Sequence, residues 1–255
     1  MPLLELSGVH MRFGGLAAVS GFDLALEAGE LVGLIGPNGA GKTTVFNLIA
    51  GIHRPAAGDI RFAGKRTLGL RPHQVAHLGV ARTFQNIRLF RGLSVLDNTL
   101  IGQGRRAAYG LGAAVLRAPA FARGEAEMAA RAVQLLHLFG LERRRDLLAA
   151  NLPYGEQRRV EIARALAGEP RLLLLDEPAA GMNPQETQDL MRLIQRVRGE
   201  FGLTILLIEH DMRVVMGICE RVVVMDHGAI IAQGTPGQIR RDPKVIEAYL
   251  GEAAR

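Results

Sequence analysis

The chain has 255 residues, of which 48% are hydrophobic and 22% are charged, and its formal net charge is +6. This length can bury one substantial core without requiring two domains, and the composition is that of an ordinary globular protein. The single cysteine, Cys219, excludes an internal disulfide and a cysteine-based zinc cluster, so we expect it to fill the core.

The charge admits nucleic acid or an anionic membrane as a partner, but only 5% of the residues are aromatic, which argues against a base-stacking surface. The N-terminus lacks the basic and apolar regions of a signal peptide, and no apolar run reaches the 18 or so residues that a membrane span needs. We therefore expect a cytoplasmic chain that does not cross a bilayer by itself.

The first elements along the chain are short strands at residues 3–9 and 22–26, followed by an apolar run at 31–35 that is typical of a buried strand. The segment 45–50 predicts the start of a helix that ends near Gly51. Between this strand and this helix lies the sequence GPNGAGKTT, from Gly36 to Thr44, which fits the phosphate-binding pattern G-x-x-x-x-G-K-[ST].

Such a loop points successive backbone N–H groups and a helix N-terminus at phosphate oxygens. Lys42 would reach the β- and γ-phosphates, and the Thr43 hydroxyl would ligate Mg²⁺. The alternative is a glycine-rich turn that carries a lysine by chance. Only three of the 31 basic residues are lysine, so a basic residue placed here by chance would almost always be arginine. The sequence therefore predicts a nucleoside triphosphate site, formed by Gly36, Asn38, Gly39, Gly41, Lys42, Thr43 and Thr44.

Further along, residues 60–62 predict one more short strand, and residues 86–165 are rich in Ala, Arg and Leu, with helical spacing at 125–139. The cluster of arginines at 143–145 is typical of a solvated helix face. Strands return at 171–176, 203–209 and 221–225, and Asn183 with Glu186 predicts a capping box at the start of a helix. The pattern indicates a mixed α/β core that is interrupted by a helical insertion.

Asp176 and Glu177 follow four leucines, so they stand at the carboxyl end of a buried strand. This is where a Mg²⁺–nucleotide partner belongs, and adjacent acids on a strand point in different directions. We expect Asp176 to hold the metal and Glu177 to polarise the attacking water. A strand that simply leaves the core through charged residues is the alternative.

These motifs resemble the ATPase subunit of ABC (ATP-binding cassette) proteins, because residues 152–159, LPYGEQRR, are similar to that family's signature sequence. The resemblance implies a P-loop NTPase fold over residues 1–255, with a mixed-sheet core and an antiparallel β subdomain at 1–85 and 166–255, and a helical subdomain at 86–165. It also implies two ATP sites at the interface of a head-to-tail dimer. Each would be closed by the partner's signature residues, which here are Leu152, Pro153, Tyr154, Gly155, Glu156 and Gln157.

Four smaller matches carry further roles by resemblance. Phe13 matches the aromatic residue that stacks on adenine, and Gln85 matches the glutamine that senses the metal. Asn183 stands in the D-loop, and His210 is similar to the histidine that contacts the γ-phosphate.

Two residues depart from the family pattern. Pro153 replaces the signature serine and removes two hydrogen-bond donors, although proline suits the first turn of a helix with Asn151 or Leu152 at its cap. Asn183 replaces the D-loop aspartate. Both changes affect the partner's nucleotide, so we hypothesise that the two ATP sites of the dimer are unequal.

Residues 82–98, the signature region and the segment 245–251 resemble one branch of the family, the larger ATPase subunit of bacterial branched-chain amino acid importers. The resemblance implies ATP and Mg²⁺ as ligands, and two permease subunits and a second ATPase subunit as partners. A periplasmic solute-binding protein would take part indirectly, nucleic acid would not, and the chain would sit on the cytoplasmic face of the inner membrane. Residues 86–90 would pass closure of the dimer to the permeases.

Three alternative functions stay open, the first much closer to this sequence than the other two. Importers of urea or other amides share much of this pattern. DNA-repair ATPases of the same class carry long coiled-coil or zinc-bearing insertions, which this chain lacks, and paired-cassette translation factors need a second phosphate loop.

Overall fold

The computed structural model describes residues 1–104 and 111–253, and the chain divides into two compact units. The first unit joins residues 1–82 to residues 171–255, and the second comprises residues 83–170. The sequence placed the corresponding divisions after residues 85 and 165. Each unit has its own core and is described by itself below.

A six-stranded sheet forms the centre of the first unit, in the order β10-β9-β3-β8-β7-β6. All neighbouring pairs are parallel except β10 with β9. Three of the strands, β3, β7 and β8, are buried along their whole length, as continuous apolar runs predict. The strand bounds are β3 Leu31–Ile35, β6 Val80–Arg82, β7 Leu172–Asp176, β8 Thr204–Ile208, β9 Arg221–Asp226 and β10 Ala229–Gly234.

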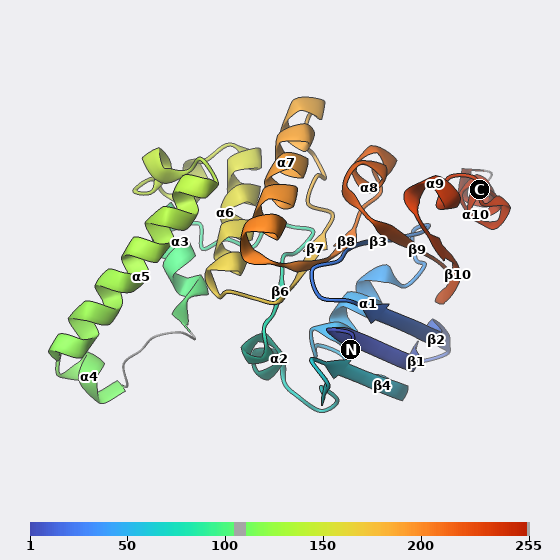
Figure 1. Ribbon diagram of the computed structural model, residues 1–255, viewed down its shortest axis with the longest axis horizontal. Helices are drawn as coiled ribbons and strands as arrows, with labels where there is room; N and C mark the ends of the chain where they lie inside the picture. The colour runs from blue at the N-terminus through green and yellow to red at the C-terminus, as the bar shows by residue number, and fades with distance from the viewer. Residues whose placement is uncertain (105–110, 254–255) are drawn as a thin grey trace. The chain divides into compact units, whose positions relative to one another are not determined.

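A second, antiparallel sheet in this unit has the order β2-β1-β4-β5, which is the antiparallel subdomain that the resemblance implied. Its strands are β1 Leu4–Phe13, β2 Leu16–Leu26, β4 Ala57–Phe62 and β5 Lys65–Arg66. The first two are longer than the predicted segments, because most of their additional residues are exposed or half-buried and show no regular apolar alternation. Helix α1 (Lys42–Ile49) lies between the two sheets, where Val45 and Phe46 join a core that both sheets share (Figure 1).

Helices α7 (Pro184–Phe201) and α8 (Met212–Ile218) contact each other and cover the opposite face of the six-stranded sheet (Figure 1). The buried stripe of α7 comprises Leu190, Ile194 and Val197 at helical spacing. The predicted capping box of α7 is confirmed, because the Asn183 side chain accepts from Glu186 N at 2.9 Å. The remaining helices of this unit are α2 Pro72–Leu78, α9 Pro236–Ile239 and α10 Pro243–Ala253.

The second unit is helical in the part that the structure describes. Its helices are α3 Val95–Gly102, α4 Leu111–Val115, α5 Pro119–Leu138 and α6 Tyr154–Ala167, with short 3₁₀ turns at Glu142–Arg144 and Ala149–Asn151. The predicted helix at 125–139 is the larger part of α5. The arginines at 143–145 are solvent-exposed as predicted, but they lie in and just after a short 3₁₀ turn that follows Gly140 and not on an α-helix.

Candidate functional site

The predicted phosphate loop connects β3 to α1 and contains three glycines with left-handed backbone, at φ 147° for Gly36, 78° for Gly39 and 99° for Gly41. A Cβ on Gly36 would lie 2.0 Å from Met225 O, and one on Gly41 would lie 2.3 Å from Ala18 O. Only glycine fits these two positions. At Gly39 a Cβ would meet nothing, so the middle of the loop faces open space.

Lys42 is the first residue of α1, so the helix starts inside the loop rather than at residue 45. Its side chain is only 6% exposed and curls back across the loop, where Nζ donates to Gly36 O at 2.6 Å and to Pro37 O at 2.8 Å. The next residue, Thr43, is exposed. The N-terminus of α1, the ammonium group and the hydroxyl thus gather at one loop, which is the donor set that a Mg²⁺–triphosphate requires.

Asp176 ends β7 and is 3% exposed. Its carboxylate accepts from Arg82 Nη2 at 2.9 Å, and the same guanidinium donates to Asn47 Oδ1 of α1 and lies 5.6 Å from the Phe46 ring centroid. Arg82 therefore ties the end of β6 to both β7 and the helix that follows the phosphate loop. The sequence did not predict a role for Arg82, because the position of an arginine in the sequence does not distinguish a buried ion pair from a surface charge.

Glu177 and His210 are in direct contact, at 2.6 Å between Glu177 Oε1 and His210 Nε2. They follow adjacent parallel strands, β7 and β8, so the topology brings them to the same edge of the sheet. Glu177 has φ 47°, a left-handed conformation that costs a non-glycine residue about 1–2 kcal/mol, and its N–H donates to Ile208 O at 2.9 Å. The structure therefore places a carboxylate and an imidazole in hydrogen-bond contact at the carboxyl edge of the sheet.

Glu209 organises the loops around this pair and was also given no role by the sequence. Its buried carboxylate accepts from the backbone N–H of Ala179 at 2.8 Å, and from those of His210 at 3.1 Å and Asp211 at 3.4 Å. Burial raises the pKa of Glu209, against the effect of these hydrogen bonds. The one feature of the sequence that could have indicated a role for Glu209 is its position directly after a buried strand and before His210.

Phe13 lies at the end of β1 with 44% of its surface exposed, and its ring makes an edge contact with His53 at 5.3 Å between centroids. An exposed aromatic ring is available for a ligand to stack on. Gln85 is exposed as well, but it belongs to the second unit, whereas Lys42, Asp176 and Glu177 belong to the first.

The signature segment leads into α6, with Leu152 buried and Pro153 exposed. The expectation that Asn151 or Leu152 would cap this helix is wrong. Pro153 is itself the N-cap, with ψ 153°, and its side chain offers no capping oxygen. Gln157 Nε2 instead donates to Leu152 O at 2.8 Å and steadies the entrance to the helix.

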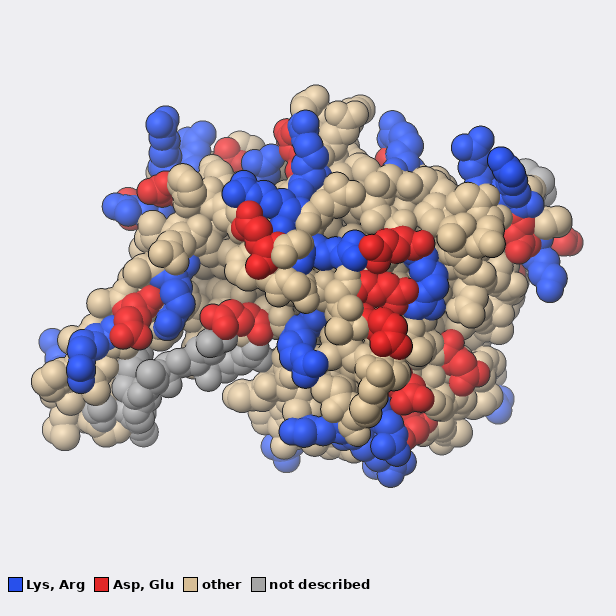
Figure 2. Space-filling view, in the orientation of Figure 1, with Lys and Arg blue, Asp and Glu red and all other residues tan. Residues whose placement is uncertain are grey.

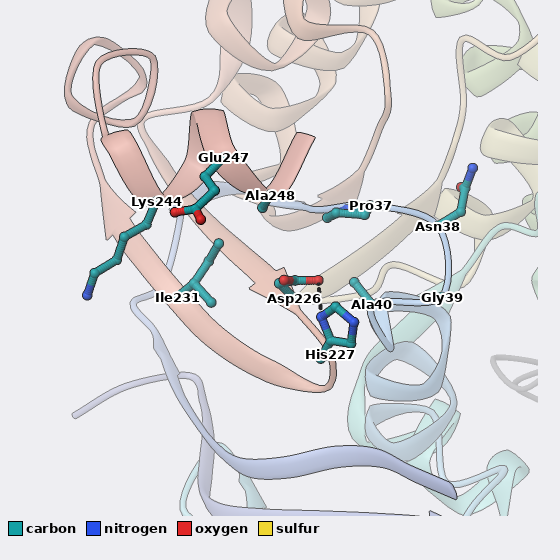
Figure 3. A pocket seen from close by; sticks show the side chains of 10 residues that line it. All are labelled: Pro37, Asn38, Gly39, Ala40, Asp226, His227, Ile231, Lys244, Glu247 and Ala248. Carbon is teal, nitrogen blue, oxygen red and sulfur yellow. Dashed lines mark ion pairs between the residues drawn. The ribbon is translucent and has the colours of Figure 1, made fainter. Parts of the chain in front are cut away.

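A cavity of about 530 Å³ opens beside the phosphate loop, between Pro37–Ala40, the turn at Asp226 and His227, and α10 (Figure 3). Figure 3 shows Glu247 of α10 pointing toward the cavity, with Asp226 and His227 on the opposite side and paired at 2.7 Å. Lys42, Thr43 and Asp176 do not line it. The cavity therefore shares Asn38 and Gly39 with the predicted phosphate site but does not include its lysine, threonine or carboxylate.

A groove of about 600 Å³ opens in the second unit. It is lined by Arg88, Leu89 and Phe90, by Ile101 and Gly102 of α3, and by Arg164 of α6. Phe90 and Ile101 are exposed, and the Arg164 guanidinium lies 5.7 Å from the Phe90 ring centroid. Burial lowers the pKa of Arg164 from its ordinary value, and the nearby Glu161 carboxylate opposes this effect.

Side chains of both charge signs are interleaved over the visible face in Figure 2. Among residues 1–104 and 111–253, no cluster of three or more His, Cys, Asp or Glu side chains could hold a metal. Over the same described ranges, no helix has the length and apolar character to span a membrane.

Comparison with known proteins shows similarity along the whole chain. Residues 19–180 match the family model described as ABC transporter, and residues 229–255 match that of the branched-chain amino acid ATP-binding cassette transporter. The chain is 50% identical over 252 residues to the high-affinity branched-chain amino acid transport ATP-binding proteins LivG of Escherichia coli (strain K12) and BraF of Pseudomonas aeruginosa, covering 99% of this chain and of each relative.

The lipopolysaccharide export system ATP-binding protein LptB of E. coli (strain K12) is 38% identical over 255 residues, covering 100% of both chains. Among solved structures, the ADP conformation of an ATP-binding cassette of an ABC transporter aligns with a TM-score of 0.86 and 31% identity, covering 98% of this chain and 99% of that one.

Proposed function

The chain belongs to the ABC transporter ATPase family, and from this premise we propose that it is the ATP-hydrolysing subunit of a branched-chain amino acid importer. The observation that carries the proposal is the 50% identity to LivG and BraF over nearly the full chain. The match of residues 229–255 to the C-terminal model of the same transporter class supports it independently of the shared nucleotide motifs. LptB, whose name assigns it to lipopolysaccharide export, is less similar at 38%.

We assign nucleotide binding to the phosphate loop and its surroundings. Lys42 and the loop amides, with Gly36, Asn38, Gly39 and Gly41 in the turn, would hold the phosphates. Phe13 would stack on the adenine. Thr43 and Asp176 would hold Mg²⁺, which would neutralise charge on the β- and γ-phosphates. The buried Arg82–Asp176 pair would fix the carboxylate before nucleotide arrives, so that little reorganisation accompanies binding.

We assign the hydrolytic step to Glu177 and His210. Glu177 would orient the attacking water and accept its proton, and His210, 2.6 Å away, would hold the carboxylate and sense the γ-phosphate. The hydrogen bonds of Glu209 to the loops after β7 and β8 keep the two groups in register. Positioning of this kind is the main catalytic resource in phosphoryl transfer.

Closure of the site would come from a second ATPase subunit. The N-terminus of the partner's α6 would face the γ-phosphate, with Gly155 N–H and the helix dipole in place of the missing serine. The Asn183 side chain caps α7, which occupies its oxygen within its own chain. Both features support the hypothesis that this chain contributes less to its partner's ATP than it receives.

We propose that the groove of the second unit receives the permease subunits. It has an exposed apolar lining of Phe90 and Ile101 flanked by Arg88 and Arg164, which suits an amphipathic permease segment with an acidic residue. Docking there would place the chain at the cytoplasmic face of the inner membrane, with a periplasmic solute-binding protein acting through the permeases.

An affinity-tagged Glu177→Gln chain tests the proposal. We expect it to bind ATP, to lose about 10²–10⁴-fold in turnover, and to accumulate as a closed dimer with ATP. We further expect hydrophobic permease subunits to co-purify from membranes with the wild-type chain. Normal turnover in the variant would refute the assignment of the base, and recovery of DNA or ribosomes in place of permeases would refute the transport function.

A further inference from the structure

Arg158 lies in the second turn of α6, five residues after the signature position Pro153, and none of its side chain is exposed. Its guanidinium donates three hydrogen bonds of 2.7 Å, to Phe84 O, Gln85 O and Glu161 Oε2. Arginine can make this set of contacts because its donors form a rigid planar fork.

Glu161, one turn later on α6, completes the arrangement with a side chain that is 1% exposed. Its Oε1 accepts from Arg88 N at 3.1 Å and from Phe84 N at 3.4 Å. Residues 83–90 form neither helix nor strand, so their backbone groups need partners from elsewhere. Two oppositely charged side chains of α6 supply them and hold both the N–H and the C=O of Phe84.

The same segment continues into the groove described above. The amide of Asn98, on α3, accepts from Phe90 N and donates to Phe90 O, both at 3.0 Å. Helices α3 and α6 meet closely at Gly102, where a Cβ would lie 2.1 Å from Arg164 O. Segment 84–90 is thus held at one end by the signature helix α6 and at the other end by α3.

Stability alone does not account for the buried charges. Replacing a buried ion pair by apolar side chains of similar volume is often neutral or stabilising, because the pair loses its hydration. An apolar pair would, however, leave the backbone groups of Phe84, Gln85 and Arg88 without these partners. What the charged pair provides, and an apolar pair would not, is hydrogen bonds to the backbone of the segment that leads into the groove.

We propose that the Arg158–Glu161 pair makes the signature helix and segment 84–90 move as one body. Arg158 and Glu161 are positioning residues that carry the nucleotide state of the partner's site to the permease groove and to the backbone of Gln85. This inference rests on the proposed function for the identity of the two ends that it connects.

The test uses the double variant Arg158→Met/Glu161→Leu, which leaves no buried charge alone. Arg196→Gln/Glu200→Gln is the matched control, because this pair has the same 2.7 Å contact on an exposed face of α7. Both variants are made in the Glu177→Gln chain, and hydrogen exchange of the amides at 84–90 is measured with and without ATP. Arg158→Lys, which keeps the charge but not the fork, serves as the second variant if the double variant does not fold.

We expect ATP-driven dimer closure to slow exchange at 84–90 by about 10-fold or more in the parent and the control, and by less than about 2-fold in the double variant. Arg158→Lys should be intermediate. In the complex with permeases, the same substitutions are also made in the chain that keeps Glu177, and there the ratio of stimulated to basal ATP hydrolysis should fall in the same order. Equal ATP-dependent protection in the parent and in the variants would overturn the proposal.

A parent chain that forms no ATP-dependent dimer would contradict the proposed function instead. In that case hydrogen exchange of the amides at 84–88 without ATP still tests whether the pair holds this backbone. If it does, these amides must exchange faster in the double variant than in the control.

Discussion

Replacement of Lys42 by alanine is the perturbation whose size can be worked out most fully. Lys42 is the one lysine of the phosphate loop, and its ammonium is already held over that loop by Gly36 O and Pro37 O. A hydrogen bond to a charged group contributes about 1.5–3 kcal/mol, so its loss weakens ATP binding by about 10- to 150-fold. Lys65→Ala is the control, because Lys65 is exposed on β5.

The assay is thermal unfolding with and without Mg²⁺–ATP, at a concentration about 100 times the wild-type Kd. Binding then stabilises the wild type by about 2.7 kcal/mol, whereas the weakened variant gains about 0.3–1.4 kcal/mol. At about 2–4 °C per kcal/mol for a chain of this size, Tm rises by about 5–11 °C in the wild type and by about 1–6 °C in the variant.

Each protein is compared with its own nucleotide-free Tm, because the substitution also removes two buried hydrogen bonds from the empty loop. Lys65→Ala should show the full wild-type shift. An undiminished ATP-dependent shift in Lys42→Ala would refute the assignment of the loop.

Three further predictions follow from local geometry. Pro153→Ser supplies the missing cap of α6, so it should raise stability by about 0.5–2 kcal/mol in thermal unfolding and increase ATP turnover of the dimer; unchanged turnover would contradict unequal sites. Gly102→Ala should lower stability by about 1–3 kcal/mol, because its Cβ would overlap Arg164 O, whereas Gly92→Ala has open space and should not. Burial raises the pKa of the Cys219 thiol to about 12, so at pH 8 it should resist iodoacetamide in the folded chain and react on unfolding.

The sequence was sufficient wherever local chemistry decides the structure. The loop from Gly36 to Thr44 needs glycines at φ values that other residues avoid, and β7 and β8 are buried on both faces, so both left clear patterns. The capping box at Asn183 and Glu186 is equally local. Edge and short strands were missed, because β6 has three residues and β10 is half-exposed without alternation.

The residues that brace the site could not be recognised in the same way. Arg82, Arg158 and Glu161 are charged side chains, which in most proteins lie on the surface. Their burial depends on partners far along the chain, such as Asp176 for Arg82 and Phe84 for Arg158. Only the tertiary structure brings these partners together, so no spacing or periodicity could identify them.

The central claim is that this ATPase drives uptake of branched-chain amino acids. Its most direct test is uptake of radiolabelled leucine into proteoliposomes that contain the chain with its co-purified permeases, internal Mg²⁺–ATP and external solute-binding protein. We expect saturable uptake that needs ATP, is competed by isoleucine and valine, and is abolished by Glu177→Gln. Accumulation of urea or another solute in place of leucine, or leucine uptake that persists with Glu177→Gln, would contradict the account.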